Sequence, residues 1–220
     1  MASGETGPWG PVVYLTADQI RLNPVIAHLS DSGRRLVWTL QGPLSSAISV
    51  MAEHGNPDGP REPYLGHGGD RHPVSNDPVT EQPVATLTVM EEYLGDWQNE
   101  WYTINQEGFD EDEDEDVEPE PEGQPPTFEP LVVTASNGEF VSIHDYVSAV
   151  HPWLMARREQ ILRARHVADD DYVPGPDEER LMVSAHNTEL VRAEDEQEGL
   201  QDLRSVFEST RHHQEERTAS

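Results

Sequence analysis

The histidine-rich stretch between His54 and Pro73 carries the side chains best suited to chemistry. His67, Asp70 and His72 fall within six residues, on a segment rich in glycine and proline. Imidazole and carboxylate groups in such a cluster can bind zinc or another divalent ion. A site of this kind would have to order a flexible loop at the expense of conformational entropy, and no supporting partner for the ligands can be named. We therefore expect a solvated polar loop and keep a metal-dependent enzyme or metal sensor as the alternative.

Two further histidines, His144 and His151, lie seven residues apart in the run FVSIHDYVSAVHPWL. On an unbroken helix they would share a face. Metal-binding pairs on helices are usually four residues apart, as in H-E-x-x-H, and Pro152 interrupts the helix beside His151. We therefore expect both histidines to have structural roles, through local hydrogen bonds or contact with water. No catalytic residue and no cofactor is predicted.

The composition of the chain excludes several classes of site. It contains no cysteine, and its 14 basic residues are all arginine. Thiolate nucleophiles, cysteine zinc sites, Schiff-base lysines and the lysine of a phosphate-binding loop are therefore ruled out. A formal net charge of −29 repels phosphate backbones and anionic membranes, so direct binding of nucleic acid is not expected. Enzymatic activity stays open, with a non-catalytic protein favoured.

One segment of the chain is extremely acidic. Seven consecutive acidic residues are followed by Glu-Pro repeats, and they are Asp110, Glu111, Asp112, Glu113, Asp114, Glu115 and Asp116. Like charges at this density repel one another, which predicts a disordered insertion over 107–127. The run could also bind a basic partner. An acidic chaperone of basic proteins such as histones is therefore a further alternative.

The pattern of apolar residues predicts an α+β fold. We expect a small, mainly antiparallel sheet with the helical unit Ser142–Arg165 packed against it, interrupted by disordered acidic and Gly/Pro-rich insertions. The expected domain covers 12–168 and includes a long irregular loop over 56–82. Residues 1–11 are expected to be a disordered N-terminus, and 169–220 a partly helical extension.

Period-two alternation and turn residues predict the strands of this domain. The expected strands are 34–41, 84–94, 100–106, 179–185 and a hairpin formed by Leu131–Ala135 and Glu139–Ile143 around an Asn-Gly turn. Short helices are expected after Thr16, whose capping box with Gln19 precedes an interruption at Pro24, and over 42–55. A longer helix is expected over 188–213.

The beginning of the Ser142–Arg165 unit has the sequence of a helix N-terminus. Ser142 can cap the first turn, and Asp145 three residues later completes a capping-box pattern. Apolar side chains then recur at helical spacing at Ile143, Val147, Val150 and Leu154. Pro152 is expected to end or kink this helix near His151.

The order of these motifs resembles a fungal domain family of unknown function. The matching segments are RLNPVIAHL, RLVWTLQGPLSS, PVATLTV, PLVVTAS and VSIHDYVSAVHPWL, which together span about Arg21 to Leu154. The chain departs from the family pattern in its Ser-Ile before His-Asp, where the family has Thr-Val, in its acidic insertion and in its C-terminal extension. The resemblance implies a compact α+β domain and supplies no catalytic residues.

These observations favour a non-catalytic intracellular protein-interaction module whose partner is another protein. The N-terminus lacks the basic and apolar segments of a signal peptide. No apolar run approaches the roughly 20 residues that a membrane-spanning helix needs. We therefore expect no membrane association and a cytoplasmic or nuclear location.

Overall fold

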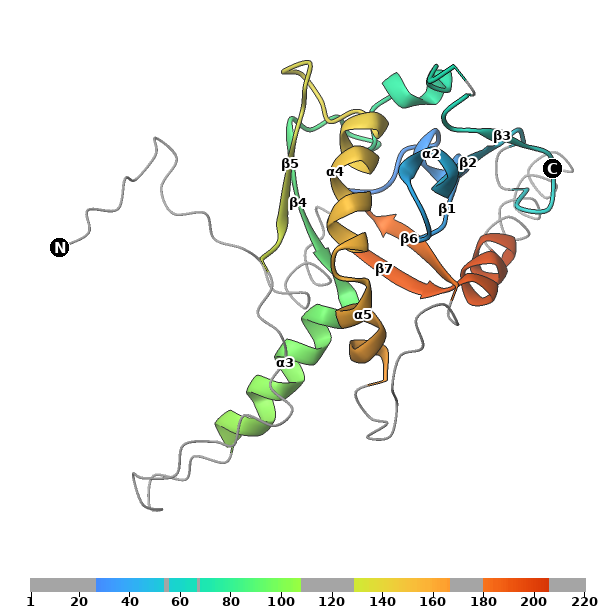
Figure 1. Ribbon diagram of the computed structural model, residues 1–220. Helices are drawn as coiled ribbons and strands as arrows, with labels where there is room; N and C mark the ends of the chain where they lie inside the picture. The colour runs from blue at the N-terminus through green and yellow to red at the C-terminus, as the bar shows by residue number, and fades with distance from the viewer. Residues whose placement is uncertain (1–26, 54–55, 67, 108–128, 167–179, 206–220) are drawn as a thin grey trace, which may run out of the picture.

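The computed structural model describes residues 27–53, 56–66, 68–107, 129–166 and 180–205. These residues form two sheets (Figure 1). Helices pack against the sheets and alternate with the strands along the chain. The α+β fold class expected from the sequence is confirmed. The predicted helix after Thr16 and the acidic run lie outside the described residues. Within the described residues, no helix is both long enough and apolar enough to cross a membrane.

The first sheet contains three antiparallel strands in the order β1-β2-β3. They are β1 (Leu36–Trp38), β2 (Ile48–Met51) and β3 (Arg61–Pro63), and the short helix α2 (Leu44–Ala47) lies between the first two. The strand expected over 34–41 is confirmed at its centre. Its first residues belong instead to a 3-10 turn, η1 (Gly33–Arg35).

The helix expected over 42–55 is limited to α2, and the chain continues as β2. Trp38 pairs with Ile48 and Leu36 pairs with Val50 across the two strands. Ile48 and Val50 are both buried, whereas Ser49 between them is half-exposed. Cross-strand packing of these β-branched side chains outweighs the helical interpretation of the same segment.

The second sheet has four strands in the order β5-β4-β7-β6. They are β4 (Thr86–Glu91), β5 (Leu131–Thr134), β6 (Leu181–Asn187) and β7 (Leu190–Asp195). The β4–β7 pair is parallel and the other two pairs are antiparallel. An isolated bridge between Thr39 and Met182 joins this sheet to the first, and Leu40 donates to the Leu181 carbonyl at 2.8 Å. β3 and β5 are therefore the two outer strands of the joined sheets.

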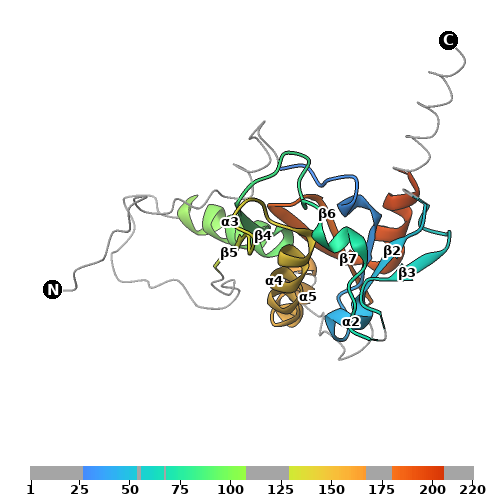
Figure 2. The same cartoon turned by 90° about the horizontal axis from the view of Figure 1, so that it is seen from above.

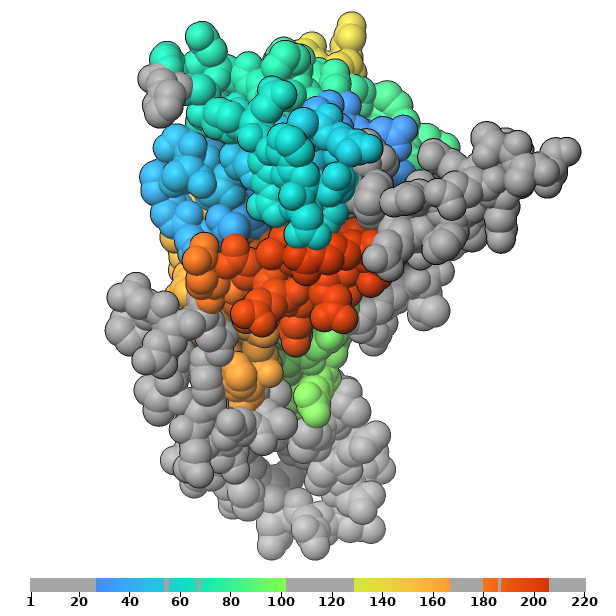
Figure 3. All heavy atoms as spheres, turned by 90° about the vertical axis from the view of Figure 1, so that its right-hand side faces the viewer, coloured from blue at the N-terminus to red at the C-terminus, as the bar shows by residue number. Residues whose placement is uncertain are grey.

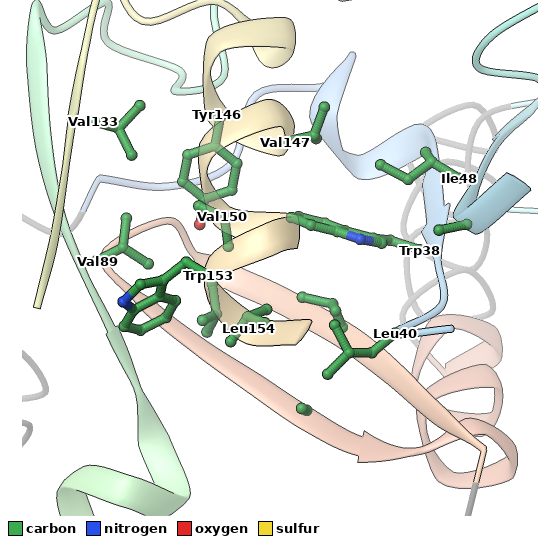
Figure 4. Close-up of a cluster of buried hydrophobic side chains, with 14 of the residues drawn as sticks. Trp38, Leu40, Ile48, Val89, Val133, Tyr146, Val147, Val150, Trp153 and Leu154 are labelled. Carbon is green, nitrogen blue, oxygen red and sulfur yellow. The ribbon is translucent and has the colours of Figure 1, made fainter. Parts of the chain in front are cut away.

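The core is built around helix α4 (Ile143–Met155). In Figure 4 this helix runs between Trp38 and Ile48 on one side and Val89 and Val133 on the other. Its buried residues recur at helical spacing, as the sequence predicted, and the largest contributions come from Tyr146, Trp153 and Leu154. The helical unit Ser142–Arg165 therefore packs against both sheets.

The predicted capping box at the start of α4 is confirmed. Ser142 Oγ accepts from the Asp145 N–H at 3.1 Å, and Asp145 Oδ2 accepts from the Ser142 N–H at 3.0 Å. Partial burial raises the pKa of Asp145, but hydrogen bonds from Ser142 and Ser136 outweigh that effect and lower it below its usual value. The carboxylate is therefore held in its charged form, which suits a helix N-terminus.

Replacing Ser142 by alanine is expected to lower the free energy of unfolding by about 1 to 2 kcal/mol, because the Asp145 N–H loses its acceptor. Ser142→Thr keeps the hydroxyl and serves as the matched control, with a loss of about half that size or less. Chemical denaturation monitored by circular dichroism measures both changes. Equal losses in the two variants would show that the cap does not stabilise the helix.

Of the two outcomes expected at Pro152, an end of the helix or a kink, the first is wrong. α4 continues to Met155, and α5 (Arg158–Arg165) follows after a short break. A proline inside a helix costs roughly 3 kcal/mol. Trp153 and Leu154 both lie beyond it and are buried, at 9% and 0% exposure. Burial of two such side chains contributes about 2 kcal/mol each or more, which offsets that cost.

The strand expected over 100–106 is wrong, because these residues belong to helix α3 (Glu92–Glu107). Leu94, Trp97 and Trp101 recur at intervals of three and four, which suits one face of a helix. Leu94 is buried, and Trp97 packs against the core. In Figure 1 the later part of α3 extends away from the sheets.

The hairpin expected over 131–143 is also corrected. Its first strand exists as β5 but pairs with β4 rather than with 139–143. The Val141 N–H donates to the Val84 carbonyl at 2.8 Å, and no named strand covers 139–143. Gly138, with a φ of 75°, provides the turn, so the Asn-Gly pair turns the chain without starting a two-stranded hairpin.

The C-terminal part of the chain is an integral part of the fold. β6 confirms the strand expected near 179–185, but β7 occupies residues that were expected to be helical. Only 196–205 of the expected helix is helical within the described residues. Because β7 lies between β4 and β6, the expected boundary at 168 does not separate an extension from the domain. Figure 3 shows this C-terminal part, in orange to red, against the cyan residues near β3.

The Gly/Pro-rich stretch 56–82 is more ordered than expected. It contains β3 and the 3-10 helix η2 (Pro73–Asn76). Tyr64, Val74 and Val79 are buried in the main core, at 0%, 4% and 0% exposure. These three apolar side chains explain why the stretch is more ordered than expected, because they attach it to the core although its sequence lacks the apolar pattern of a helix or strand.

Candidate functional site

Of the residues proposed as metal ligands, His72 has structural partners for both ring nitrogens, and Asp70 takes part in a turn through its backbone carbonyl. His72 Nδ1 accepts from the Val74 N–H at 3.3 Å, which caps η2, and its Nε2 lies 3.2 Å from Glu62 Oε2. The Asp70 carbonyl accepts from the Gly66 N–H at 2.8 Å in a tight turn. His67 lies outside the described residues. Metal binding by this loop therefore stays a prediction, and no group of three or more candidate ligands is found in the part that is described.

His151 is buried and joins α4 to the first sheet. Its Nδ1 accepts from Trp38 Nε1 at 3.1 Å, and its Nε2 lies 3.0 Å from the Gly42 carbonyl oxygen. An indole N–H can only donate and a carbonyl can only accept. These two partners therefore require a neutral imidazole with its proton on Nε2. With 4% exposure, the ring has no surface to offer a substrate.

His144 has a comparable role nearer the surface. Its Nδ1 lies 3.2 Å from the Tyr64 hydroxyl and 3.2 Å from Ser148 Oγ, and its ring stacks on Tyr64. Partial burial, with a smaller contribution from Arg71, lowers the pKa of His144 below its usual value. Both histidines therefore have the structural role that was expected. The partners of His151, however, come from segments far away in the sequence rather than from its own helix.

Glu91 is the strongest candidate for an acid–base catalyst, because its pKa is raised far above the usual value. It is the last residue of β4 and is fully buried, at 0% exposure. Burial raises its pKa to about 8, and the nearby carboxylates of Glu92 and Asp96 add a smaller effect in the same direction. A carboxyl group with so high a pKa is a common feature of acid–base catalysts.

The hydrogen bonds of Glu91 nevertheless assign it to the fold. Its Oε2 accepts from the Leu94 N–H at 2.9 Å, in the first turn of α3. Its Oε1 accepts from the Ala193 N–H at 3.3 Å, on β7. Both oxygens are therefore engaged with the backbone, and neither reaches solvent. The carboxyl group holds the start of α3 against the parallel pair β4–β7.

A charged cluster surrounds Tyr93, where β7 meets α3 and α5. Arg192 pairs with Glu92 at 2.8 Å, and the guanidinium groups of Arg192 and Arg165 both lie over the ring of Tyr93. Arg192 belongs to β7, Glu92 and Tyr93 belong to α3, and Arg165 belongs to α5, so the cluster joins these three elements. The arrangement pairs opposite charges between β7 and α3 and so supports the packing of these elements.

Glu194 is buried beside the helix at 196–205. Burial raises its pKa, with a smaller contribution from Asp202, while Arg192 acts in the opposite direction. A side chain at Gly199 would begin 3.1 Å from Glu194 Oε1 and 3.0 Å from Met182 Sδ. Glycine therefore allows the helix to pass closely over β6 and β7. The same helix is attached by Arg204, which binds both carboxylate oxygens of Asp58 at 2.7 Å.

The two outer strands of the joined sheets differ in how they are protected. β3 is short and exposed, and it carries Arg61, Glu62 and Pro63. Charges, proline and short length are the features that prevent pairing at an outer strand. β5, with the sequence Leu-Val-Val-Thr, has none of these residues, and Val132 is 46% exposed. Figure 2 shows β5 and β3 at opposite ends of the body.

β5 is therefore the candidate interaction surface of the described residues. Within them its only strand partner is β4, so one side of β5 carries no ladder. The sequence analysis identified the strand but not its outer position, because strand order depends on the pairing of β4 with the distant β7. The interaction residues proposed from sequence, Asp110–Asp116, are not among the described ones.

No protein-family model, curated protein or solved structure matches this chain. The resemblance to a fungal domain family therefore stays a prediction from sequence motifs.

Proposed function

We propose that the chain is a non-catalytic intracellular module that binds another protein. The observation that carries the proposal is the outer strand β5, which is uncharged and has Val132 exposed. An outer strand without charge or proline is a template for pairing with a second chain. The opposite outer strand, β3, has the features that prevent such pairing.

The side chains best suited to catalysis support the same proposal, because their polar atoms form hydrogen bonds within the fold. Glu91 and His151 are both buried, and each uses two ring or carboxylate atoms for hydrogen bonds to other segments. A catalyst must approach its substrate to within hydrogen-bonding distance. Neither group can do so without opening the core.

Native mass spectrometry with elemental analysis, on protein purified from its own host, tests this function. We expect a second protein in stoichiometric amount and no stoichiometric metal. Cross-linking in cells before purification preserves a weak complex. Stoichiometric metal that is lost in a His67→Ala/His72→Ala variant would contradict the proposal and favour the metal-dependent alternative.

The acidic run Asp110–Asp116 supports a second candidate, a chaperone of basic proteins. Seven consecutive carboxylates attract lysine- and arginine-rich partners through charge alone. Deletion of 110–122 separates the two candidates. Loss of histone binding on deletion would favour the chaperone, and unchanged binding would reject it.

A further inference from the structure

We propose that β5 binds an extended, arginine- or lysine-rich segment of a partner protein as an added antiparallel or parallel strand. This inference rests on the proposed function and specifies its surface and the chemistry of its partner. Strand addition of this kind supplies affinity through main-chain hydrogen bonds and specificity through alternate side chains.

The register of the β4–β5 pair shows which backbone groups are available. Thr86 pairs with Thr134 and Leu87 with Val133, and the Ala135 N–H donates to the Ala85 carbonyl at 2.9 Å. In an antiparallel pair, residues alternate between those that bond to the partner strand and those that point away from it. Val133 and Ala135 therefore bond to β4.

Val132 and Thr134 consequently direct their N–H and C=O groups toward the outer side of β5. Among the described residues, no strand pairs on that side. The strand can therefore offer two donors and two acceptors to an incoming chain. The same two residues have exposed side chains, whereas Val133 between them is buried.

The side chains around this edge indicate what the added strand would contact. Thr86 lies opposite Thr134 and Thr88 lies opposite Val132, so the outer face of the β4–β5 pair carries threonines and one valine. Such a face accepts β-branched or small side chains from a neighbouring strand. It contains no charge that would exclude an apolar residue next to Val132.

The net charge of the chain indicates the sign of the charge expected on the partner segment. The sequence carries 43 acidic residues against 14 basic ones, all arginine. Glu129 just before β5 and Glu139 just after its turn are both exposed. An acidic segment would be repelled from this edge, whereas a basic one would be attracted over about 8 Å at physiological salt.

The test uses the full chain and an acetylated, amidated octapeptide of alternating arginine and valine as the probe. Two matched peptides separate the contributions. One carries an N-methyl group at every residue, which removes the N–H donors from both edges of the peptide strand and keeps the charge. The other replaces arginine by glutamate, which keeps the strand propensity and reverses the charge. Fluorescence anisotropy measures binding, and amide hydrogen exchange by NMR locates it.

Two variants locate the interaction on the protein. Val132→Pro removes an outward N–H that does not bond to β4, a position where an outer strand tolerates proline. Val132→Thr keeps that N–H and is the matched control. We expect the arginine–valine peptide to bind and to protect the amides of Val132 and Thr134. We expect Val132→Pro to weaken binding about tenfold or more, and Val132→Thr to change it by about threefold or less.

Three results would overturn the inference. The N-methylated peptide cannot pair as a strand, so equal binding of both arginine peptides would show that charge alone is responsible. Protection of Val132 and Thr134 in the free chain would show that a segment of the same chain already covers β5. Absence of binding by the arginine–valine peptide would reject a basic strand. In each case, a stoichiometric protein partner found by native mass spectrometry would still support the proposed function. The partner would then bind to another surface of the chain.

Discussion

Replacing His151 by alanine is expected to lower the free energy of unfolding by about 3 to 5 kcal/mol, because the change opens a cavity and leaves two buried polar groups without partners. The indole N–H of Trp38 would lose its acceptor, and the Gly42 carbonyl would lose its donor. His151 thereby joins α4 to the stretch Trp38–Gly42, more than 100 residues earlier in the sequence. Urea denaturation monitored by tryptophan fluorescence measures the loss.

Two further variants assign this loss to its causes. His151→Asn keeps an acceptor close to the position of Nδ1, and so should retain the Trp38 contact and recover part of the stability. Trp38→Phe removes the N–H donor, and a double-mutant cycle with His151→Ala, which removes the acceptor, then isolates the interaction between the two rings. His144→Ala is the control, because this histidine is only partly buried. An effect of His151→Ala no larger than that of His144→Ala would contradict the structural role of the buried ring.

The same histidine explains why the sequence was a poor guide to the end of α4. The residue before a proline is normally biased away from helical backbone angles. His151 occupies that position and is nevertheless helical. Its two hydrogen bonds to distant segments hold it there, together with the burial of Trp153 and Leu154 beyond the proline. Such tertiary contacts are absent from any local pattern.

Local patterns succeeded where one face of an element is buried over several residues. The alternation of Leu87 and Val89 with Thr86 and Thr88 correctly predicted β4 and its buried face. Continued by one step, the same alternation places Glu91 on the buried side. A carboxylate on the buried face of an apolar strand was therefore visible in the sequence at Glu91.

Local patterns failed in short segments whose apolar residues fit both the period of a helix and the period of a strand. Residues 100–106 and 190–195 each admit a helical and a strand interpretation. The outcome was decided by partners: α3 packs beside α5, and β7 inserts between β4 and β6. The position of β5 at the outside of the sheet has the same origin. It follows from a parallel pairing between strands about 100 residues apart, which no local signal specifies.

The buried Glu91 leads to the second large expected effect, which is a dependence of stability on pH. The pKa of this group is raised from 4.5 to about 8 in the folded protein, mainly by burial. Below about pH 4.5 the carboxyl is protonated in both states and contributes no penalty. Above that pH the unfolded chain ionises, whereas the folded protein keeps the proton until about pH 8. The contribution of Glu91 to stability is therefore lost as the pH rises through this window.

The expected size of this effect is about 4 kcal/mol between about pH 5 and about pH 8, since each pH unit of the window corresponds to about 1.4 kcal/mol. Glu91→Gln removes the ionisation and should remove this slope. The amide supplies a single acceptor to the two backbone N–H groups, so the variant also loses about 1 to 2 kcal/mol at every pH. The informative quantity is therefore the change with pH of the difference between the two proteins.

Chemical denaturation of wild type and Glu91→Gln at a series of pH values measures that difference. Taking the difference cancels the repulsion among the other carboxylates, which changes with pH in both proteins. Glu159→Gln is the matched control, because it removes a carboxylate whose side chain is 74% exposed and which pairs with Arg163 on the same helix. It should keep the wild-type slope. A difference between wild type and Glu91→Gln that stays constant with pH would mean that Glu91 is ionised in the folded protein. The backbone N–H groups of Leu94 and Ala193 would then stabilise the charge by more than burial penalises it.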